Sequence, residues 1–190
     1  DGTWAEGEYT RIDFATTGGL SPATVIDTDQ NGTADRIYAG DLEGNLWVVD
    51  VRSDNPAVWS TAFGSRTFAQ PMFKARNGAG DPQAIVAAPT VTRHKTAGLL
   101  ASGANTLVSF GTGQYFNVAD ALNDEVQSFY TVWDKGVQIA SRTLLKPVVM
   151  TQELAGRRIE PDKVDWLTQY GWYLDFKTET GERIINKAVI

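Results

Sequence analysis

Residues 27–51 read DTDQNGTADRIYAGDLEGNLWVVDV, and the first nine of them concentrate acidic and amide side chains. Asp27, Asp29 and Asn31 alternate at the first, third and fifth places, so their oxygen atoms can point to one centre, and a glycine at the sixth place permits a sharp turn. Asp35 follows at the ninth place, earlier than the Glu that closes a twelve-residue EF-hand loop. The spacing predicts a short cation-binding loop.

The oxygen donors of this loop indicate which cation it would hold. They are carboxylates, an amide and the main-chain carbonyl of Thr33 at the seventh place, with no Cys or His among them. Such hard donors favour Ca²⁺ over Zn²⁺ or Cu²⁺, and Mg²⁺ fits less well because it keeps several waters in an octahedral shell. A solvated turn is the alternative, since Asp, Asn and Gly also favour turns. The predicted Ca²⁺ ligands are Asp27, Asp29, Asn31, Thr33 (main chain) and Asp35.

Composition describes a globular, acidic protein. The 190 residues are 42% hydrophobic and 11% aromatic, enough for one sizeable core or two small ones. The net charge of −6 and the pI of about 4.8 argue against a nucleic-acid partner, which requires clustered Lys and Arg. Because the chain has no Cys, it forms neither disulfides nor thiolate metal sites.

The sequence contains no stretch of about 20 apolar residues, so no transmembrane segment is predicted. Its first ten residues, DGTWAEGEYT, lack the basic end and apolar run of a signal peptide. The protein is therefore expected either to be cytosolic or to be a fragment of a larger exported protein. A Ca²⁺ site favours the second interpretation, because calcium outside the cell is abundant enough to fill a modest site.

Strand-like patterns dominate the chain and surround the loop. Residues 24–26 lead into it, residues 36–39 leave it, and residues 46–51 return after a Gly44-Asn45 turn signal, which predicts a loop between two strands of a hairpin. Short helices are expected at 118–127 and 162–169. Further strand-like runs lie at 72–75, 84–87, 90–93, 107–110, 115–118, 129–133, 137–140, 148–150, 172–176 and 183–189.

Proline recurs at the start of these runs, at Pro22, Pro71, Pro89 and Pro147. A proline suits the first residue of a strand or an edge strand. The recurrence resembles degenerate β-meander repeats, which are typical of propeller blades. The predicted fold is all-β, a partial β-propeller-like array of three or four antiparallel meander blades. Residues 1–190 would form a single propeller-type domain or its C-terminal part.

Other residues that could act in catalysis or bind a ligand are interpreted as structural. His94 is the one histidine and has no recognisable nucleophile near it, so no catalytic residue is predicted and His94 is expected on the surface or in a hairpin. Trp47 lies in a segment similar to the strand signature of quinoprotein propellers and is expected to pack between blades. Asp120, Asn123, Asp124 and Glu125 are interpreted as an acidic solvated turn or helix end rather than a second cation site.

The stretch at 27–51 resembles the C-terminal β-propeller domain of the PilC/PilY family of type IV pilus-biogenesis and pilus-tip adhesin proteins. AAPTVTRH, VSFGTGQYFNVAD, QSFYTVWD, YGWYLDF and GERIINKAVI follow in the family's order, at 87–94, 108–120, 127–134, 170–176 and 181–190. The resemblance implies a modified propeller with a nine-residue calcium loop on a hairpin. It also implies export to the cell surface or pilus tip, and regulation of pilus extension and retraction. The family's variable N-terminal adhesive region has no counterpart here.

Two functions of different classes follow. The first is a non-enzymatic calcium-binding domain whose partners are pilins or other pilus-assembly proteins, with host-surface ligands binding through regions outside these residues. The second is a fragment of a pyrroloquinoline-quinone dehydrogenase, in which Ca²⁺ would polarise the cofactor and an Asp would act as general base. A quinone site needs ligands from several blades, whereas these carboxylates are consecutive in one loop, so the first function is favoured.

Overall fold

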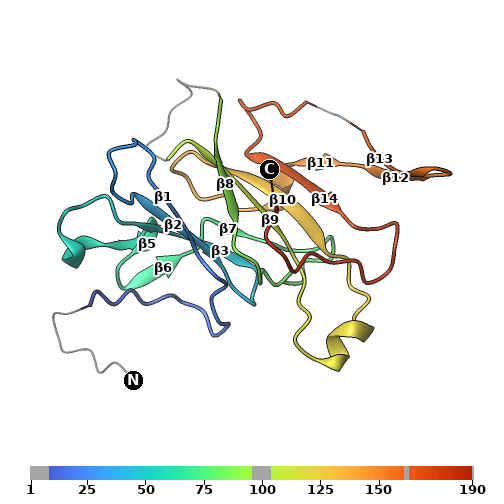
Figure 1. The fold of residues 1–190 in the computed structure, drawn as a ribbon, viewed down its shortest axis with the longest axis horizontal. Coiled ribbons are helices and arrows are strands. Elements are labelled where there is room, and N and C mark those ends of the chain that lie inside the picture. Colours follow the sequence, from blue (N-terminus) through green and yellow to red (C-terminus); the bar gives the residue numbers. More distant parts are fainter. Residues whose placement is uncertain (1–8, 96–103, 161–162, 190) are drawn as a thin grey trace.

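The computed structural model describes residues 9–95, 104–160 and 163–189, and this part of the chain contains β-strands and short 3-10 helices but no α-helix. The strands form two five-stranded sheets and two two-stranded sheets (Figure 1). Most pairings are antiparallel, so the prediction of an all-β, propeller-like array is confirmed. No helix of the described ranges has the length and apolar character that a membrane span needs.

The first sheet carries the loop of residues 27–35. Its strand order is β1-β2-β3-β4, and β7 also pairs with β3. The hairpin of β1 and β2 is antiparallel, with Ile26 opposite Arg36, so the loop joins two adjacent strands as predicted. The strand bounds are β1 (Thr24–Ile26), β2 (Arg36–Gly40), β3 (Asn45–Asp50), β4 (Ser60–Thr61) and β7 (Phe73–Lys74).

The second sheet has the order β11-β14-β10-β9-β8, in which β14 pairs in parallel with β11 and antiparallel with β10. Its strands are β8 (Thr90–Arg93), β9 (Thr106–Gly111), β10 (Ser128–Asp134), β11 (Lys146–Val148) and β14 (Gly171–Asp175). The small sheets are hairpins of β5 (Phe63–Ser65) with β6 (Phe68–Gln70), and of β12 (Met150–Glu153) with β13 (Gly156–Ile159). The 3-10 helices are η1 (Pro56–Val58), η2 (Val118–Leu122) and η3 (Arg142–Leu144).

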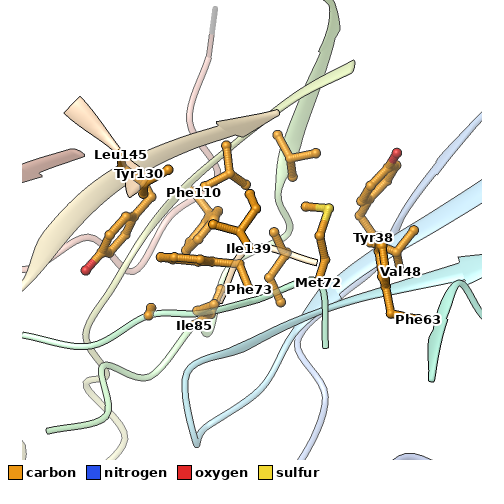
Figure 2. Packing of buried hydrophobic residues seen from close by; sticks show 14 residues of the cluster. Tyr38, Val48, Phe63, Met72, Phe73, Ile85, Phe110, Tyr130, Ile139 and Leu145 are labelled. Atoms are coloured by element: carbon orange, nitrogen blue, oxygen red, sulfur yellow. The ribbon is translucent and has the colours of Figure 1, made fainter. Parts of the chain in front are cut away.

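One hydrophobic core lies between the two large sheets (Figure 2). Tyr38 and Val48 enter it from the first sheet, and Phe110 and Tyr130 from the second. Phe73 of β7 joins the two sets, because its ring centroid lies 6.4 Å from that of Phe110 and 5.3 Å from that of Tyr130. Each such buried side chain contributes about 1.5–3 kcal/mol. Neither large sheet therefore has a complete core of its own.

A buried hydrogen bond also joins the sheets. The Tyr38 hydroxyl of β2 donates to Asp134 at the end of β10 over 2.8 Å, and it lies 3.0 Å from the Thr106 hydroxyl of β9. Burial, together with the Asp134 charge, raises the pKa of Tyr38 far above its ordinary value. The phenol therefore stays protonated and keeps the buried carboxylate hydrogen-bonded.

Several expectations about the elements were wrong. The described residues form two blade-like sheets rather than three or four, because the runs at 84–87 and 137–140 supply only single bridges and extra strands enlarge the two sheets. Residues 115–118 and 183–189 form no strand. The helix expected at 118–127 is the short η2, and 163–169 contain a turn; Asp162 lies outside the described residues.

Trp47 lies elsewhere than expected, and His94 meets only one of its two expectations. Trp47 is buried on the face of β3 opposite the core, where its ring meets Phe14 edge-on at 5.2 Å, so it does not pack between the large sheets. His94 lies in the hairpin of β8 and β9, as one of the two expectations had it, and its N–H donates to the Asn105 carbonyl over 3.0 Å; it is only 4% exposed, so it does not lie on the surface. It stacks on Trp133 at 4.5 Å and meets Trp166 edge-on at 4.4 Å. Neither contact could be read from local sequence, because the aromatic partners are distant in the chain.

The burial of His94 predicts a pH-dependent stability. Burial lowers the pKa of this imidazole below its ordinary value of about 6.5, so the unfolded chain takes up the proton first as the pH falls. The free energy of unfolding therefore has its full value above about pH 6.5 and decreases below that pH, by at most about 1.4 kcal/mol per pH unit. Urea titrations between pH 5.5 and 8 would measure this slope. His94→Gln should flatten it, and an equal slope in both proteins would contradict the assignment to His94.

Candidate metal centre

The loop of residues 27–35 is held at its C-terminal end by two main-chain bonds, one to β1 and one to the residue that follows β3. The Asp35 N–H donates to the Ile26 carbonyl over 2.8 Å, and the Asp35 carbonyl accepts from the Val51 N–H over 3.0 Å. Asp35 begins the return into β2 and is 4% exposed. Its carboxylate is therefore fixed relative to β1, β2 and β3.

Asp27 shapes the turn at the other end. Its carboxylate accepts hydrogen bonds from the N–H groups of Gln30 at 2.6 Å, Asn31 at 3.3 Å and Gly32 at 2.7 Å. Gln30 and Gly32 have φ values of 64° and 92°, the left-handed region that a glycine adopts without strain. The bond from Gly32, with those from Gln30 and Asn31, lowers the pKa of Asp27 despite the opposing effect of burial. Asp27 is thus an anion that organises the loop.

The turn brings the three predicted carboxylates together. One oxygen from each of Asp27, Asp29 and Asp35 lies within 4.8 Å of the others, and among the described residues this is the one group of three or more acidic, His or Cys side chains so arranged. Asp29 is exposed and Asp35 is buried. Three hard, negatively charged donors at this separation fit a divalent cation such as Ca²⁺.

Asn31 and Thr33 lie in the same loop, but the Asn31 side chain is turned toward its neighbours. Its Nδ2 donates to Asp29 over 2.9 Å, and its Oδ1 accepts from the N–H of Thr33 over 2.8 Å and from the Thr33 hydroxyl over 2.5 Å. The amide oxygen would have to exchange these bonds for a cation. No donor from the described ranges bonds to the Thr33 carbonyl.

Thr28 and Arg93 support the loop and were not predicted. The N–H of Thr28 donates to Asp35 Oδ2 over 2.6 Å, and its hydroxyl donates to the same oxygen. Arg93 of β8 donates to the Thr28 carbonyl over 2.9 Å, which ties the loop to the second sheet. Thr28 could have been suspected from its place inside the loop. Arg93 could not, because it is 65 residues away.

In the second acidic group, around residues 120–125, Asp120 caps the start of a 3-10 helix. Asp120 accepts from Gln114 Nε2 at 3.0 Å and from the Phe116 N–H at 2.7 Å, and it completes a capping box with Asn117 at the start of η2. Hydrogen bonding from Gln114, and then from Phe116, lowers the pKa of Asp120. This confirms the helix-end interpretation, although Asp120 is buried and not solvated.

The fold and the loop define a class of protein: an all-β propeller-type domain with a carboxylate-lined hairpin loop. The family described as PilY1 beta-propeller domain matches residues 11–152, most of the sequence. The chain belongs to this family, which confirms the resemblance read from the sequence.

Relatives agree with this assignment. The type IV pilus biogenesis factor PilY1 of Pseudomonas aeruginosa is 34% identical over 215 residues, covering 90% of this chain and 18% of the relative. A PilY1 homolog of Xylella fastidiosa is 30% identical over 180 residues, covering 88% of this chain and 12% of the relative. The crystal structure of the Pseudomonas aeruginosa PilY1 C-terminal domain superposes with a TM-score of 0.74 at 32% identity, covering 93% of this chain and 43% of that one. The chain thus spans less than a fifth of these curated relatives.

Proposed function

We propose that this chain is the calcium-binding part of a propeller domain in an exported type IV pilus biogenesis protein. In this proposal the chain is not an enzyme, and it acts at the cell surface, at the pilus tip or in association with the outer membrane. A Ca²⁺-dependent loop regulates pilus extension and retraction, and with them surface attachment and twitching motility. The convergence of Asp27, Asp29 and Asp35 in a chain of the PilY1 family is the observation that carries the proposal.

Calcium would act by neutralising repulsion within the loop. Asp27 and Asp35 already hold the loop through hydrogen bonds, whereas Asp29 is exposed and, within the described part of the chain, accepts hydrogen bonds from Asn31 alone. A bound cation would be held by the three carboxylates together with the Thr33 carbonyl and, after rotation of its amide, Asn31. Binding to the folded loop alone would add about 2.7 kcal/mol at a hundred times Kd. That is enough to shift a local opening equilibrium about a hundredfold.

The loop's contacts offer a route by which the ion could affect a partner. Asp35 fixes Thr28, and Thr28 is bonded to Arg93 at the end of β8. Ordering the loop therefore also orders the junction of the two sheets. A docking surface that includes this junction would respond to calcium without any chemical step. Pilins or other pilus-assembly proteins are the proposed partners, and the acidic composition argues against a nucleic-acid partner.

A quinoprotein dehydrogenase is the competing function, and two observations disfavour it. The carboxylates come from one hairpin loop and not from several blades, and the family match is to PilY1. Adding pyrroloquinoline quinone and an electron acceptor tests this directly. Turnover of an alcohol would contradict the proposed non-enzymatic function.

The regulatory role is tested in the whole protein and its bacterium. Asp29→Ala is the suitable variant, because Asp35 also holds Thr28 and its replacement would confound folding with binding. Loss of calcium binding should be accompanied by altered numbers of surface pili and altered twitching motility. Asp124→Ala, at another exposed acidic residue, is the control. If Asp29→Ala abolishes calcium binding while export, pili and motility match the parent, the ion has no regulatory role.

A further inference from the structure

A cleft of about 650 Å³ lies away from the calcium loop, between the segment that follows β7 and the region of η3 and β14. Lys74, Arg76 and the Gly78–Gly80 segment form one wall. Arg142, Tyr173 and Lys177 lie on the opposite wall, and the cleft's size is that of an ordinary ligand site.

The charge of this cleft is opposite to that of the whole chain. Four cationic side chains line it, Lys74, Arg76, Arg142 and Lys177, and its one acidic side chain is Asp175, so the lining carries a net charge of +3 (four minus one) in a chain of net charge −6. Asp175 is already paired, with Arg142 at 2.6 Å and Lys177 at 3.3 Å. Among the described residues, Lys74 and Arg76 form no ion pair, although Arg76 Nη1 donates to the main-chain carbonyls of Glu43 at 2.7 Å and Ala75 at 2.9 Å.

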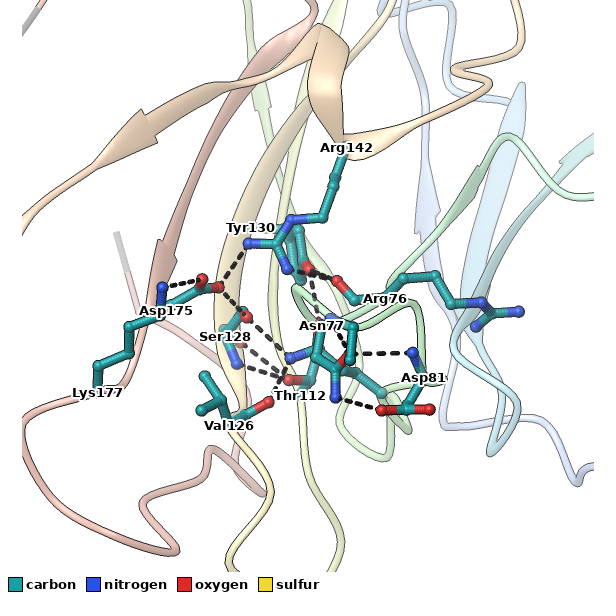
Figure 3. Close-up of polar contacts among 12 residues, drawn as sticks. Arg76, Asn77, Asp81, Thr112, Val126, Ser128, Tyr130, Arg142, Asp175 and Lys177 are labelled. Carbon is teal, nitrogen blue, oxygen red and sulfur yellow. Dashed lines mark hydrogen bonds and ion pairs between the residues drawn. The ribbon is translucent and has the colours of Figure 1, made fainter.

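The wall that contains Arg142 and Tyr173 is held in place by buried contacts (Figure 3). Arg142 donates through Nη1 to the Arg76 carbonyl over 2.5 Å and lies over the Tyr173 ring at 3.9 Å. Asp175 accepts from the Ser128 hydroxyl over 2.7 Å. Burial would raise the pKa of Asp175, but hydrogen bonds from Ser128 and Arg142 lower it overall. The side chains of Arg142 and Asp175 are about one-tenth exposed, so this wall is preorganised for a ligand.

The wall that Lys74 and Arg76 begin continues as backbone, in the loop that follows β7. Asn77 closes the loop after β7, because its side-chain oxygen accepts from the N–H groups of Ala79 and Asp81, each at 2.9 Å. Gly78 and Gly80 leave open space where a side chain would stand. An extended ligand can therefore approach the main chain closely here.

We propose that this cleft binds an acidic peptide segment of a partner protein, with carboxylates at both ends of the bound stretch. The cations are spread along the cleft: in Figure 3 the Arg76 side chain extends away from Arg142, and Lys177 lies on the other side. A compact anion cannot meet all of them, whereas separated Asp or Glu side chains can. Tyr173 and Ala140 add apolar surface to the lining, which suits peptide side chains better than a sugar polymer.

The test uses a fluorescein-labelled peptide of sequence EEFEE and its uncharged counterpart QQFQQ, with binding followed by fluorescence anisotropy. The parent should bind only EEFEE, and the affinity should fall as salt is raised, because the contacts are partly exposed. Lys74→Glu combined with Lys177→Glu should weaken binding by about tenfold or more. Lys187→Glu makes the same kind of charge change at an exposed lysine outside the cleft and should change the affinity by less than about twofold.

Several results would overturn the proposal. They are absence of EEFEE binding by the parent, an equal loss in Lys187→Glu, and equal binding of QQFQQ. Failure of excess unlabelled EEFEE to displace the labelled peptide would show that the protein binds the dye and not the peptide. Unchanged circular dichroism and melting temperature of the double variant establish that it folds. Asp29→Ala should bind the peptide like the parent with or without Ca²⁺. The proposal for this cleft and the proposal for the calcium loop can therefore be tested independently.

Discussion

Replacing Asp41 by alanine is expected to lower the free energy of unfolding by about 3–5 kcal/mol, because several buried donors lose their acceptor at once. Asp41 is fully buried. Its carboxylate accepts from the N–H groups of Glu43 and Asn45 at 2.9 and 2.8 Å, and from Asn45 Nδ2 and Trp47 Nε1, each at 2.8 Å. Hydrogen bonds to a charged group are worth about 1.5–3 kcal/mol each. One side chain thus closes the turn between β2 and β3.

The backbone of this turn is also tightly enclosed by neighbouring segments. Gly44 has a φ of 78°, and a Cβ there would lie 2.6 Å from the Gln83 carbonyl oxygen and 2.7 Å from that of Ala75. The backbone is therefore enclosed by neighbouring segments, and a loosened turn would disturb them. The Asp41 carbonyl further accepts from the Ile85 N–H over 2.9 Å.

Urea unfolding followed by tryptophan fluorescence measures the effect, and Trp47 reports directly on the altered site. Asp54→Ala, which removes an exposed carboxylate, should change the stability by less than about 0.5 kcal/mol. A loss below about 1 kcal/mol in Asp41→Ala would show that water replaces the lost acceptor, contrary to the burial of this site.

Replacing Asp29 by alanine should weaken Ca²⁺ binding by about tenfold or more and leave the stability of the calcium-free protein unchanged. Asp29 lies with Asp27 and Asp35 in the 4.8 Å group, but it is exposed and holds no strand. At a calcium concentration a hundred times the parent's Kd, the parent gains about 2.7 kcal/mol, and a tenfold weaker variant gains about 1.4 kcal/mol.

Titration calorimetry and melting curves with and without calcium test both parts of this expectation. Asp124→Ala should match the parent, since Asp124 is exposed and lies after η2, outside the loop. Indistinguishable isotherms for the parent and Asp29→Ala would remove this loop as a calcium site. A destabilised calcium-free variant would instead show that Asp29 has a structural role.

The parts of the fold that sequence reasoning predicted are those controlled locally. The bounds of β1 coincide with the expected run at 24–26, and the loop of residues 27–35 brings Asp27, Asp29 and Asp35 together because nine residues with a left-handed glycine can curl in only a few ways. The strands β2 and β3 were likewise visible, because a short apolar run rich in aromatic and β-branched residues beside a turn signal is a local property.

The failures all involve distant parts of the chain. Residues 183–189 have a strand-like pattern, but Ile184 instead bonds to Thr112 and packs on Gly111, so tertiary contacts decide its conformation. The burial of His94 depends on Trp133 and Trp166. The cationic cleft gathers side chains from β7, η3 and the end of β14, and no spacing in the sequence connects them.

The order of the second sheet has a consequence for synthesis on the ribosome. β14 lies between β11 and β10, yet it is the last strand of this sheet to be translated. Until residues 171–175 emerge, β10 has an unpaired edge, and exposed strand edges recruit other chains. Pairing that must wait for distant residues is slow. A nascent chain stalled before β14 should therefore aggregate or require a chaperone, whereas one released after it can close the sheet.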